Sequence, residues 1–153
     1  MLVNQNVCFV IADGGHARFV KLSDVKALYT VEALDSAAAN KRTHDLVTDR
    51  PGRSFESSGP TRHGYTPRHD PHDVERHKFG QLIGTLLRDG AVPGGFDALV
   101  LVAPADVLKD IIGALDAATE KKVAGTLDKD LVKVPDHELQ PHLAEWVRPP
   151  TRG

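Results

Sequence analysis

Two uninterrupted runs of apolar residues constrain the fold of this chain more than any other feature. Val7–Ala12 (VCFVIA) and Ala98–Ala103 (ALVLVA) consist only of apolar residues. A strand with one face in water alternates apolar and polar residues, whereas a continuous apolar run is typical of a strand buried on both faces. Both runs are far too short to span a bilayer. We therefore expect a sheet that is covered on both of its faces.

The size and composition of the chain favour one soluble domain. It has 153 residues, of which 41% are hydrophobic and 26% are charged, and its net charge of −2 gives no overall attraction to nucleic acid. The first apolar run lacks the preceding basic region of a signal peptide, and the single cysteine suits a reducing compartment. We expect one domain over residues 1–147, a polar tail at 148–153, a cytoplasmic location and no membrane association.

The first third of the sequence predicts three antiparallel strands. The turn sequence Asp13-Gly14-Gly15-His16 follows the first apolar run, and glycine pairs of this kind are strong turn signals. Residues 17–22 alternate in polarity and indicate the partner strand. A second turn at Ser23-Asp24 leads to residues 27–34, which are rich in β-branched and aromatic residues. These segments together predict a three-stranded meander.

The second half alternates between helix and strand signals. A helix from about Asp70 to Gly90 is predicted by an apolar stripe that contains Phe79, Leu82, Ile83, Leu86 and Leu87. The second apolar run follows, then a helix of about 15 residues through Val107 to Ala118, a strand at 123–127 and a short helix at 136–147, which contains Pro141. The order βββ, long loop, αβαβα predicts an α/β fold with a mixed sheet, the layout of the ribonuclease H-like folds.

Residues 48–70 form no predicted regular element, and loops of this length are usually functional or disordered. Within the wider region 41–78 lie five of the eight histidines and eight of the nineteen basic residues, against six acids. This excess of positive charge favours contact with phosphate, most readily that of RNA, and a merely solvated loop is the alternative. The residues that we expect to contact phosphate are Arg50, Arg53, Arg62, His63 and Arg68.

The segment Asp49-Arg50-Pro51-Gly52-Arg53 is the most specific local pattern in that loop. Pro-Gly makes a turn, so the two flanking arginines can converge on one anion. Alternatively, Arg50 pairs with Asp49 or Asp45 and only holds the loop in place.

The sequence contains no recognisable catalytic motif, and two residues are candidates for catalysis. Asp13 follows the first strand, where nucleases of the ribonuclease H-like type hold a metal ion, and it would need further acids such as Asp73, Glu75 and Asp97. The alternative is that Asp13 caps the hairpin turn. His63 is the other weak catalytic candidate. The histidines at 69, 72 and 77 do not share a helix face, so we predict neither a metal ion nor a cofactor.

Four segments of the chain carry a resemblance to a known family. They are VIADGGHARF (10–19), DLVTDRPGRSF (45–55), FDALVLVAPADVL (96–108) and LDKDLVKVP (127–135). They resemble the bacterial host attachment protein family, whose members are described as required for attachment to host cells. The resemblance covers nearly the whole chain from Val7 to Trp146, and the DRPGR-F segment is its most specific part.

That family is in turn similar to the central, catalytic domain of archaeo-eukaryotic peptide-chain release factors. The resemblance implies a release-factor-like fold and a role at the ribosome or on structured RNA. In release factors, the loop at the position of residues 48–70 carries Gly-Gly-Gln, which this chain lacks. The alternatives are a protein-interaction or regulatory module in host attachment, and a hydrolase of the peptidyl-tRNA or metal-dependent nuclease type. An unpaired sheet edge would also allow a homo-oligomer.

Overall fold

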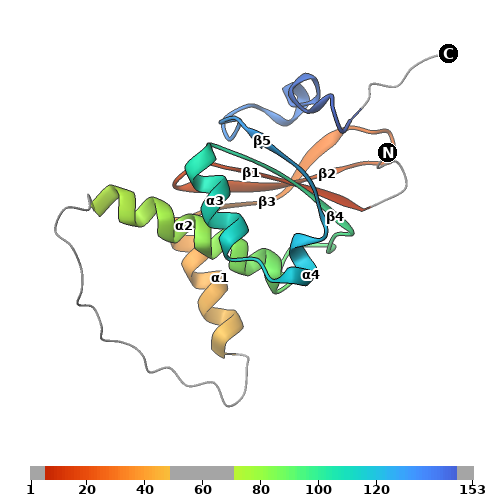
Figure 1. Ribbon diagram of the computed structural model, residues 1–153. Helices are drawn as coiled ribbons and strands as arrows, with labels where there is room; N and C mark the ends of the chain where they lie inside the picture. The colour runs from red at the N-terminus through yellow and green to blue at the C-terminus, as the bar shows by residue number, and fades with distance from the viewer. Residues whose placement is uncertain (1–5, 49–70, 148–153) are drawn as a thin grey trace.

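The architecture of the protein is a five-stranded sheet between two unequal layers (Figure 1). It is known from a computed structural model, which describes residues 6–48 and 71–147. The strands lie in the order β3-β2-β1-β4-β5. Their bounds are β1 (Val7–Ala12), β2 (His16–Leu22), β3 (Leu28–Asp35), β4 (Ala98–Ala103) and β5 (Val123–Asp128).

The sheet is mixed, as the sequence predicts. β1, β2 and β3 are antiparallel neighbours and form the expected meander. β4 lies parallel to β1, with Val7 opposite Ala98 and Ile11 opposite Val102, and β5 lies parallel to β4. The two uninterrupted apolar strands, β1 and β4, are therefore central neighbours, and every residue in both is buried.

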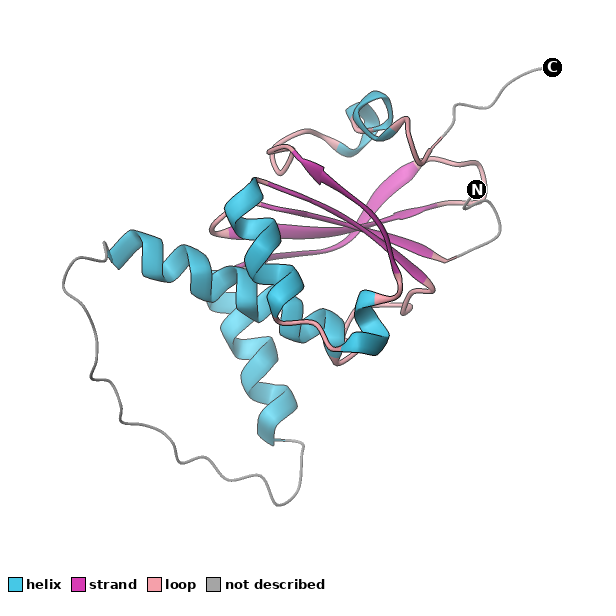
Figure 2. Ribbon diagram, in the orientation of Figure 1, coloured by secondary structure: helices cyan, strands magenta, loops and turns pink. Residues whose placement is uncertain are grey.

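Helices cover one face of the sheet and the C-terminal segment covers the other (Figure 2). The helix-side core joins Phe79, Ile83 and Ile111 to the strands, and the opposite core joins Leu131, Leu139 and Leu143 to them. The helical elements are α1 (Ser36–Thr48), α2 (Pro71–Arg88), α3 (Ala105–Gly113), α4 (Ala117–Glu120) and the 3-10 turns η1 (Asp136–Glu138) and η2 (Gln140–Leu143). No helix in the described ranges is long and apolar enough to cross a membrane.

The sequence pattern does not predict α1, which directly follows β3. The carboxylate of Asp35 accepts a hydrogen bond from the backbone N–H of Ala38 at 2.9 Å and caps the start of this helix. Alanines favour the helix, but Ala39 is its one fully buried residue among residues 36–45, whose side chains are described. A helix that buries so little apolar surface has no apolar stripe to reveal it.

The predicted helix of about 15 residues through Val107 to Ala118 is wrong in length. α3 ends at Gly113, and a separate short helix, α4, begins at Ala117. Asp116 caps α4, because its carboxylate accepts the backbone N–H of Thr119 at 2.9 Å. The apolar periodicity alone predicts one continuous helix. The chain instead leaves the helix after Gly113 and begins a new one at the Asp116 cap.

The predicted helix at 136–147 is also replaced by shorter elements. The chain forms the two 3-10 turns η1 and η2, with Pro141 in the first turn of η2. Proline has no backbone N–H to continue a helical hydrogen-bond ladder at this point. The short turns still bury Leu139 and Leu143 fully against the sheet, so they replace the packing that a helix would supply.

Candidate functional site at the hairpin end of the sheet

Several polar side chains meet where β1 ends and the turn to β2 begins. Because β1 and β4 are parallel, both finish at this edge of the sheet, which we call the hairpin end. α3 starts directly after β4, and the first half of α2 reaches the same edge (Figure 1). The hairpin end therefore combines a glycine-rich turn with side chains from two helices.

Asp13 holds the turn between β1 and β2. Its Oδ1 atom accepts hydrogen bonds from the backbone N–H groups of Gly15 at 2.9 Å and His16 at 2.7 Å. The Nδ1 atom of His16 lies 3.5 Å from the same oxygen. This carboxylate thus performs the turn-capping role that the sequence offers as the alternative to catalysis.

The acids that a nuclease would require do not gather around Asp13. Asp97 precedes β4 and accepts the backbone N–H of Asn6 at 3.2 Å, at the opposite end of β1. Six strand residues separate the two ends, a span of roughly 20 Å, so Asp97 is wrong as a partner of Asp13. Within residues 6–48 and 71–147, no three His, Cys, Asp or Glu side chains are grouped so that they could hold a metal ion.

Arg76 of α2 connects the turn to α3. Its guanidinium binds both carboxylate oxygens of Asp106, at 2.9 and 3.2 Å. These hydrogen bonds raise the pKa of Arg76 and lower the pKa of Asp106 relative to their ordinary values. The side chain also covers Gly14 so closely that a β-carbon there would lie 2.3 Å from the Nη1 atom. Gly14 therefore provides the space that this link needs.

Part of the basic region predicted at 41–78 is committed to ion pairs within the chain. Arg76 pairs with Asp106, and the Nδ1 atom of His77 lies 2.5 Å from the Oδ2 atom of Asp110. Arg42 pairs with Glu32. These three basic side chains hold helices in place, so the positive charge available to a ligand must come from other members of the region.

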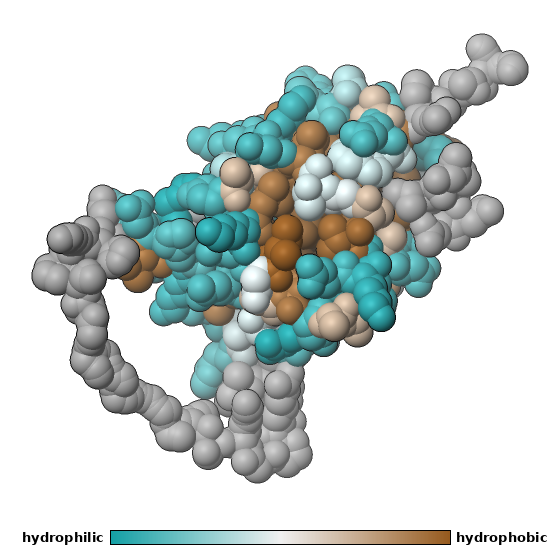
Figure 3. Space-filling view, viewed as in Figure 1, coloured by the Kyte–Doolittle hydropathy of each residue, from teal (hydrophilic) through white to brown (hydrophobic). Residues whose placement is uncertain are grey.

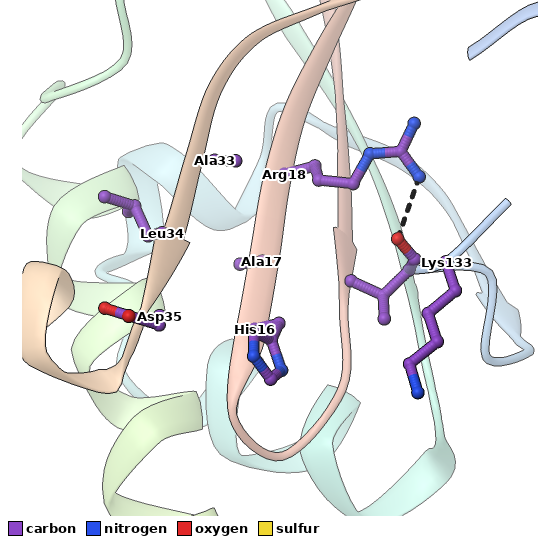
Figure 4. Close-up of a pocket in the computed structure, with 8 residues that line it drawn as sticks. His16, Ala17, Arg18, Ala33, Leu34, Asp35 and Lys133 are labelled. Atoms are coloured by element: carbon purple, nitrogen blue, oxygen red, sulfur yellow. Dashed lines mark hydrogen bonds between the residues drawn. The ribbon is translucent and has the colours of Figure 1, made fainter. Parts of the chain in front are cut away.

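A pocket of about 320 Å³ opens on the sheet face that carries the C-terminal segment. Strand β2 and the end of β3 form its floor, and residues between β5 and η1 form one wall (Figure 4). Its lining consists of His16, Ala17, Arg18, Ala33, Leu34, Asp35, Val132 and Lys133.

Arg18 fixes the wall of this pocket. Its Nη1 atom donates to the backbone carbonyls of Val132 at 3.0 Å and Val134 at 2.6 Å, and its Nη2 atom lies 2.5 Å from Asp136 Oδ1. Thr30 adds two hydrogen bonds to the same carboxylate, one from its backbone N–H and one from its hydroxyl. Burial alone would raise the pKa of Asp136, but the bonds from Thr30 and Arg18 hold it below its ordinary value.

Two basic groups besides Arg18 border the pocket, His16 and Lys133 (Figure 4). Both lie in segments that carry the family resemblance, but no pattern of residues in those segments indicates a ligand site. Sequence reasoning also misses Arg18, since most of its partners lie more than a hundred residues away along the chain. The only local signal is an arginine in the middle of a strand whose neighbours are apolar.

The residues expected to contact phosphate, Arg50, Arg53, Arg62, His63 and Arg68, lie outside the described residues. Their role remains a prediction. The structure does define the elements at either side of them, since α1 ends at Thr48 and α2 begins at Pro71. Both helices pack on the same face of the sheet and contact each other.

Comparison with known proteins identifies the family of the chain. No curated protein is significantly similar to it. A family model described as "Protein required for attachment to host cells" matches residues 8–143. This match covers most of the chain, including the five strands except Val7, and it confirms the resemblance to the host attachment family carried by the four sequence segments. The chain belongs to the family of proteins required for attachment to host cells.

Proposed function

We propose that the protein binds RNA, on the ribosome or in another structured form, through the arginines between α1 and α2. The observation that carries this proposal is the charge of that region. Residues 41–78 hold eight basic residues against six acids in a chain whose net charge is −2. Binding of this kind is driven by release of counterions from phosphate, and arginine is well suited to it because its planar fork binds phosphate oxygens in pairs.

The geometry at the start of α2 supports the proposal. Pro71 lies five residues before Arg76, which is about 8 Å along a helix. Arg76 in turn packs on Gly14 and binds Asp106. The residues that follow Arg68 in sequence are thus attached to a rigid part of the fold. Arg68 is separated from this anchored helix by only two residues.

The strand arrangement supports the more distant relationship. An antiparallel meander followed by two parallel strands, in the order β3-β2-β1-β4-β5, is compatible with a ribonuclease H-like fold and with the central domain of release factors. We include this relationship in the proposal. Because the sequence lacks Gly-Gly-Gln, the proposal is limited to binding and does not extend to peptidyl-tRNA hydrolysis.

Co-sedimentation with ribosomes, and titration of a fluorescently labelled structured RNA, test this proposal at two salt concentrations. The Arg50→Ala/Arg53→Ala variant should bind more weakly and with a shallower salt dependence, with an unchanged melting temperature. Lys121→Ala/Lys129→Ala removes the same charge from exposed positions elsewhere and should bind like the wild type. If both variants bind RNA equally weakly, the effect comes from net charge and not from these two arginines. If the wild type does not bind RNA, the proposal is rejected.

A second candidate function is binding of a protein partner, because α3 and the β5 edge of the sheet offer a different kind of surface. Figure 3 shows an apolar band across the face on which α3 and β5 lie. Partly buried Ile112, Leu115 and Val123 belong to this face. β5 is also the last strand of the sheet, and edge strands of this kind can pair with another chain.

A second copy of the chain is the first partner to test at this surface. Two-fold, antiparallel pairing of β5 would place Lys122 of one copy near Asp128 of the other. Sedimentation equilibrium of the full chain should then show a dimer, and Thr126→Pro, at an exposed position of the edge strand, should dissociate it. A monomer at all concentrations would reject self-pairing through β5.

A further inference from the structure

We propose that the pocket beside β2 and β3 binds a small organic anion, with one carboxylate or phosphate group on a compact apolar body. This site is separate from the RNA contact proposed above, and its argument uses none of the arginines between α1 and α2. Three features carry it: the size and rigidity of the pocket, its free positive charge, and its apolar floor.

The pocket has the size and rigidity of a preformed ligand site. Its volume of about 320 Å³ is at the lower end of the range for small-molecule sites. Arg18 ties the wall at 131–134 to strand β2 through three backbone carbonyls and Asp136. Because the wall is held by these bonds, a ligand can enter without first ordering a loop.

Lys133 supplies a positive charge at the pocket. Lys133 lines it and has no hydrogen-bond or ion-pair partner within the described part of the chain. His16 supplies a second nitrogen-bearing group on the same side as Lys133 (Figure 4). One free ammonium group, beside an imidazole whose Nδ1 atom lies 3.5 Å from Asp13, favours an anionic head group.

The acidic side chains near the pocket already accept hydrogen bonds from other groups of the protein. Asp35 caps α1 through the backbone N–H of Ala38, and in Figure 4 its carboxylate points away from His16 and Lys133. Asp13 accepts the N–H groups of the hairpin turn. Asp136 is bound by Arg18 and Thr30. Asp13 and Asp35 keep their negative charge but are engaged by backbone N–H groups, whereas Lys133 has no hydrogen-bond or ion-pair partner among the described residues.

The floor of the pocket is small and apolar. Ala33 and Val132 contribute side chains to it, together with the backbone of the two strands, including that of Ala17. Short side chains create the space, and they give a bound molecule apolar contact rather than hydrogen bonds. The pocket therefore suits an apolar body of a few carbon atoms and does not suit a bare inorganic ion.

Titration of the ¹⁵N-labelled full chain with phenyl phosphate and with benzoate tests the proposal, because the two probes share a ring and differ in the anionic group. Both should shift the amide signals of Ala17, Ala33 and Val132. Benzyl alcohol, which is neutral, and inorganic phosphate, which has no apolar body, should bind about tenfold more weakly or not at all. Binding of benzyl alcohol as tight as that of benzoate would overturn the assignment of charge, and failure of both anionic probes would overturn the site.

Two variants separate the charge from the cavity. Lys133→Met keeps an unbranched side chain but removes the charge, and should weaken both anions about tenfold. Ala33→Leu fills the pocket from an exposed position and should abolish their binding with the melting temperature unchanged. Lys129→Met, an exposed lysine in the same stretch of chain that does not line the pocket, is the matched control and should bind like the wild type. Wild-type affinity in Lys133→Met or in Ala33→Leu would overturn the proposal.

Discussion

The guanidinium of Arg76 lies against the backbone of Gly14, where a β-carbon would come within 2.3 Å of its Nη1 atom and 2.6 Å of its Cγ atom. This contact connects the turn after β1 to α2, and the Asp106 ion pair extends the connection to α3. The backbone of Gly14 has no positive φ. Glycine is therefore required at this position for space and not for backbone conformation.

Gly14→Ala should destabilise the fold by about 1 kcal/mol, because the added methyl group displaces Arg76 from Asp106. Gly15→Ala is the matched control, since a β-carbon there would meet nothing within 4 Å. Urea denaturation of both variants measures the difference. In an Arg76→Ala background, Gly14→Ala should lower the free energy of unfolding much less. An equal loss in both backgrounds would show that the contact between Gly14 and Arg76 is not responsible.

Asp136→Asn should lower the free energy of unfolding by about 1 kcal/mol at pH 7, because the ion pair with Arg18 is lost. The pKa of Asp136 is lowered in the folded protein, so its stabilising contribution is present above the ordinary value of 3.8 and is lost as pH falls through the folded value. The difference between the wild type and the variant should therefore be constant from pH 7 to about 5 and shrink below about 4.

Chemical denaturation across this pH range measures the difference between the two proteins. Asp130→Asn, at an exposed acid in the same segment, is the control and should follow the wild type. A difference that grew as the pH fell would contradict the assignment of the Arg18–Asp136 pair.

Gly125→Ala should loosen the C-terminal segment from β5. A β-carbon at Gly125 would lie 2.6–2.8 Å from three atoms of the Trp146 ring, which must then move away. We expect a red shift of tryptophan emission and a loss of about 1–3 kcal/mol in stability. Gly113→Ala has open space around the new methyl group and should leave the emission unchanged. Because Trp146 is the single tryptophan, the signal has one source.

Cys8 should resist thiol reagents in the folded protein. It lies fully buried in β1, and burial raises the pKa of its thiol to about 12. At pH 8 the reaction with Ellman's reagent should therefore be slow and should follow the rate of opening of the fold. A Cys8→Ala/Val25→Cys variant places the thiol at a position that is 77% exposed and should react rapidly. Comparable rates for the two thiols would show that β1 is accessible.

The strands were predictable because their signals are local. The apolar runs of β1 and β4 reflect burial on both faces, and Asp13 with the following glycines marks the hairpin. α1 gave no such signal, because an alanine-rich helix that buries little surface has no apolar periodicity. The break between α3 and α4 depends on the helix cap at Asp116, although the apolar periodicity continues through it.

The candidate site was less predictable, for a different reason. The turn-capping role of Asp13 follows from its neighbours in sequence, and it was one of the two interpretations that the sequence offers. The roles of Arg18 and Lys133 depend on how the C-terminal segment docks on β2, and no local pattern encodes that docking. The arginines between α1 and α2 remain a prediction from charge alone.

The hydrogen bonds of Arg18 to the C-terminal segment join parts of the chain that are synthesised far apart in time. Arg18 is among the first residues to leave the site of synthesis, yet four of its acceptors, three carbonyls and the carboxylate of Asp136, follow it by 113 to 118 positions. Until those residues emerge, the guanidinium on β2 has only Thr30 among its final acceptors and lies beside the apolar strand β1. A chain interrupted before Asp136 would keep that charge exposed and its second sheet face uncovered, which would distinguish an unfinished product from a complete one for the proteases and chaperones that monitor nascent proteins.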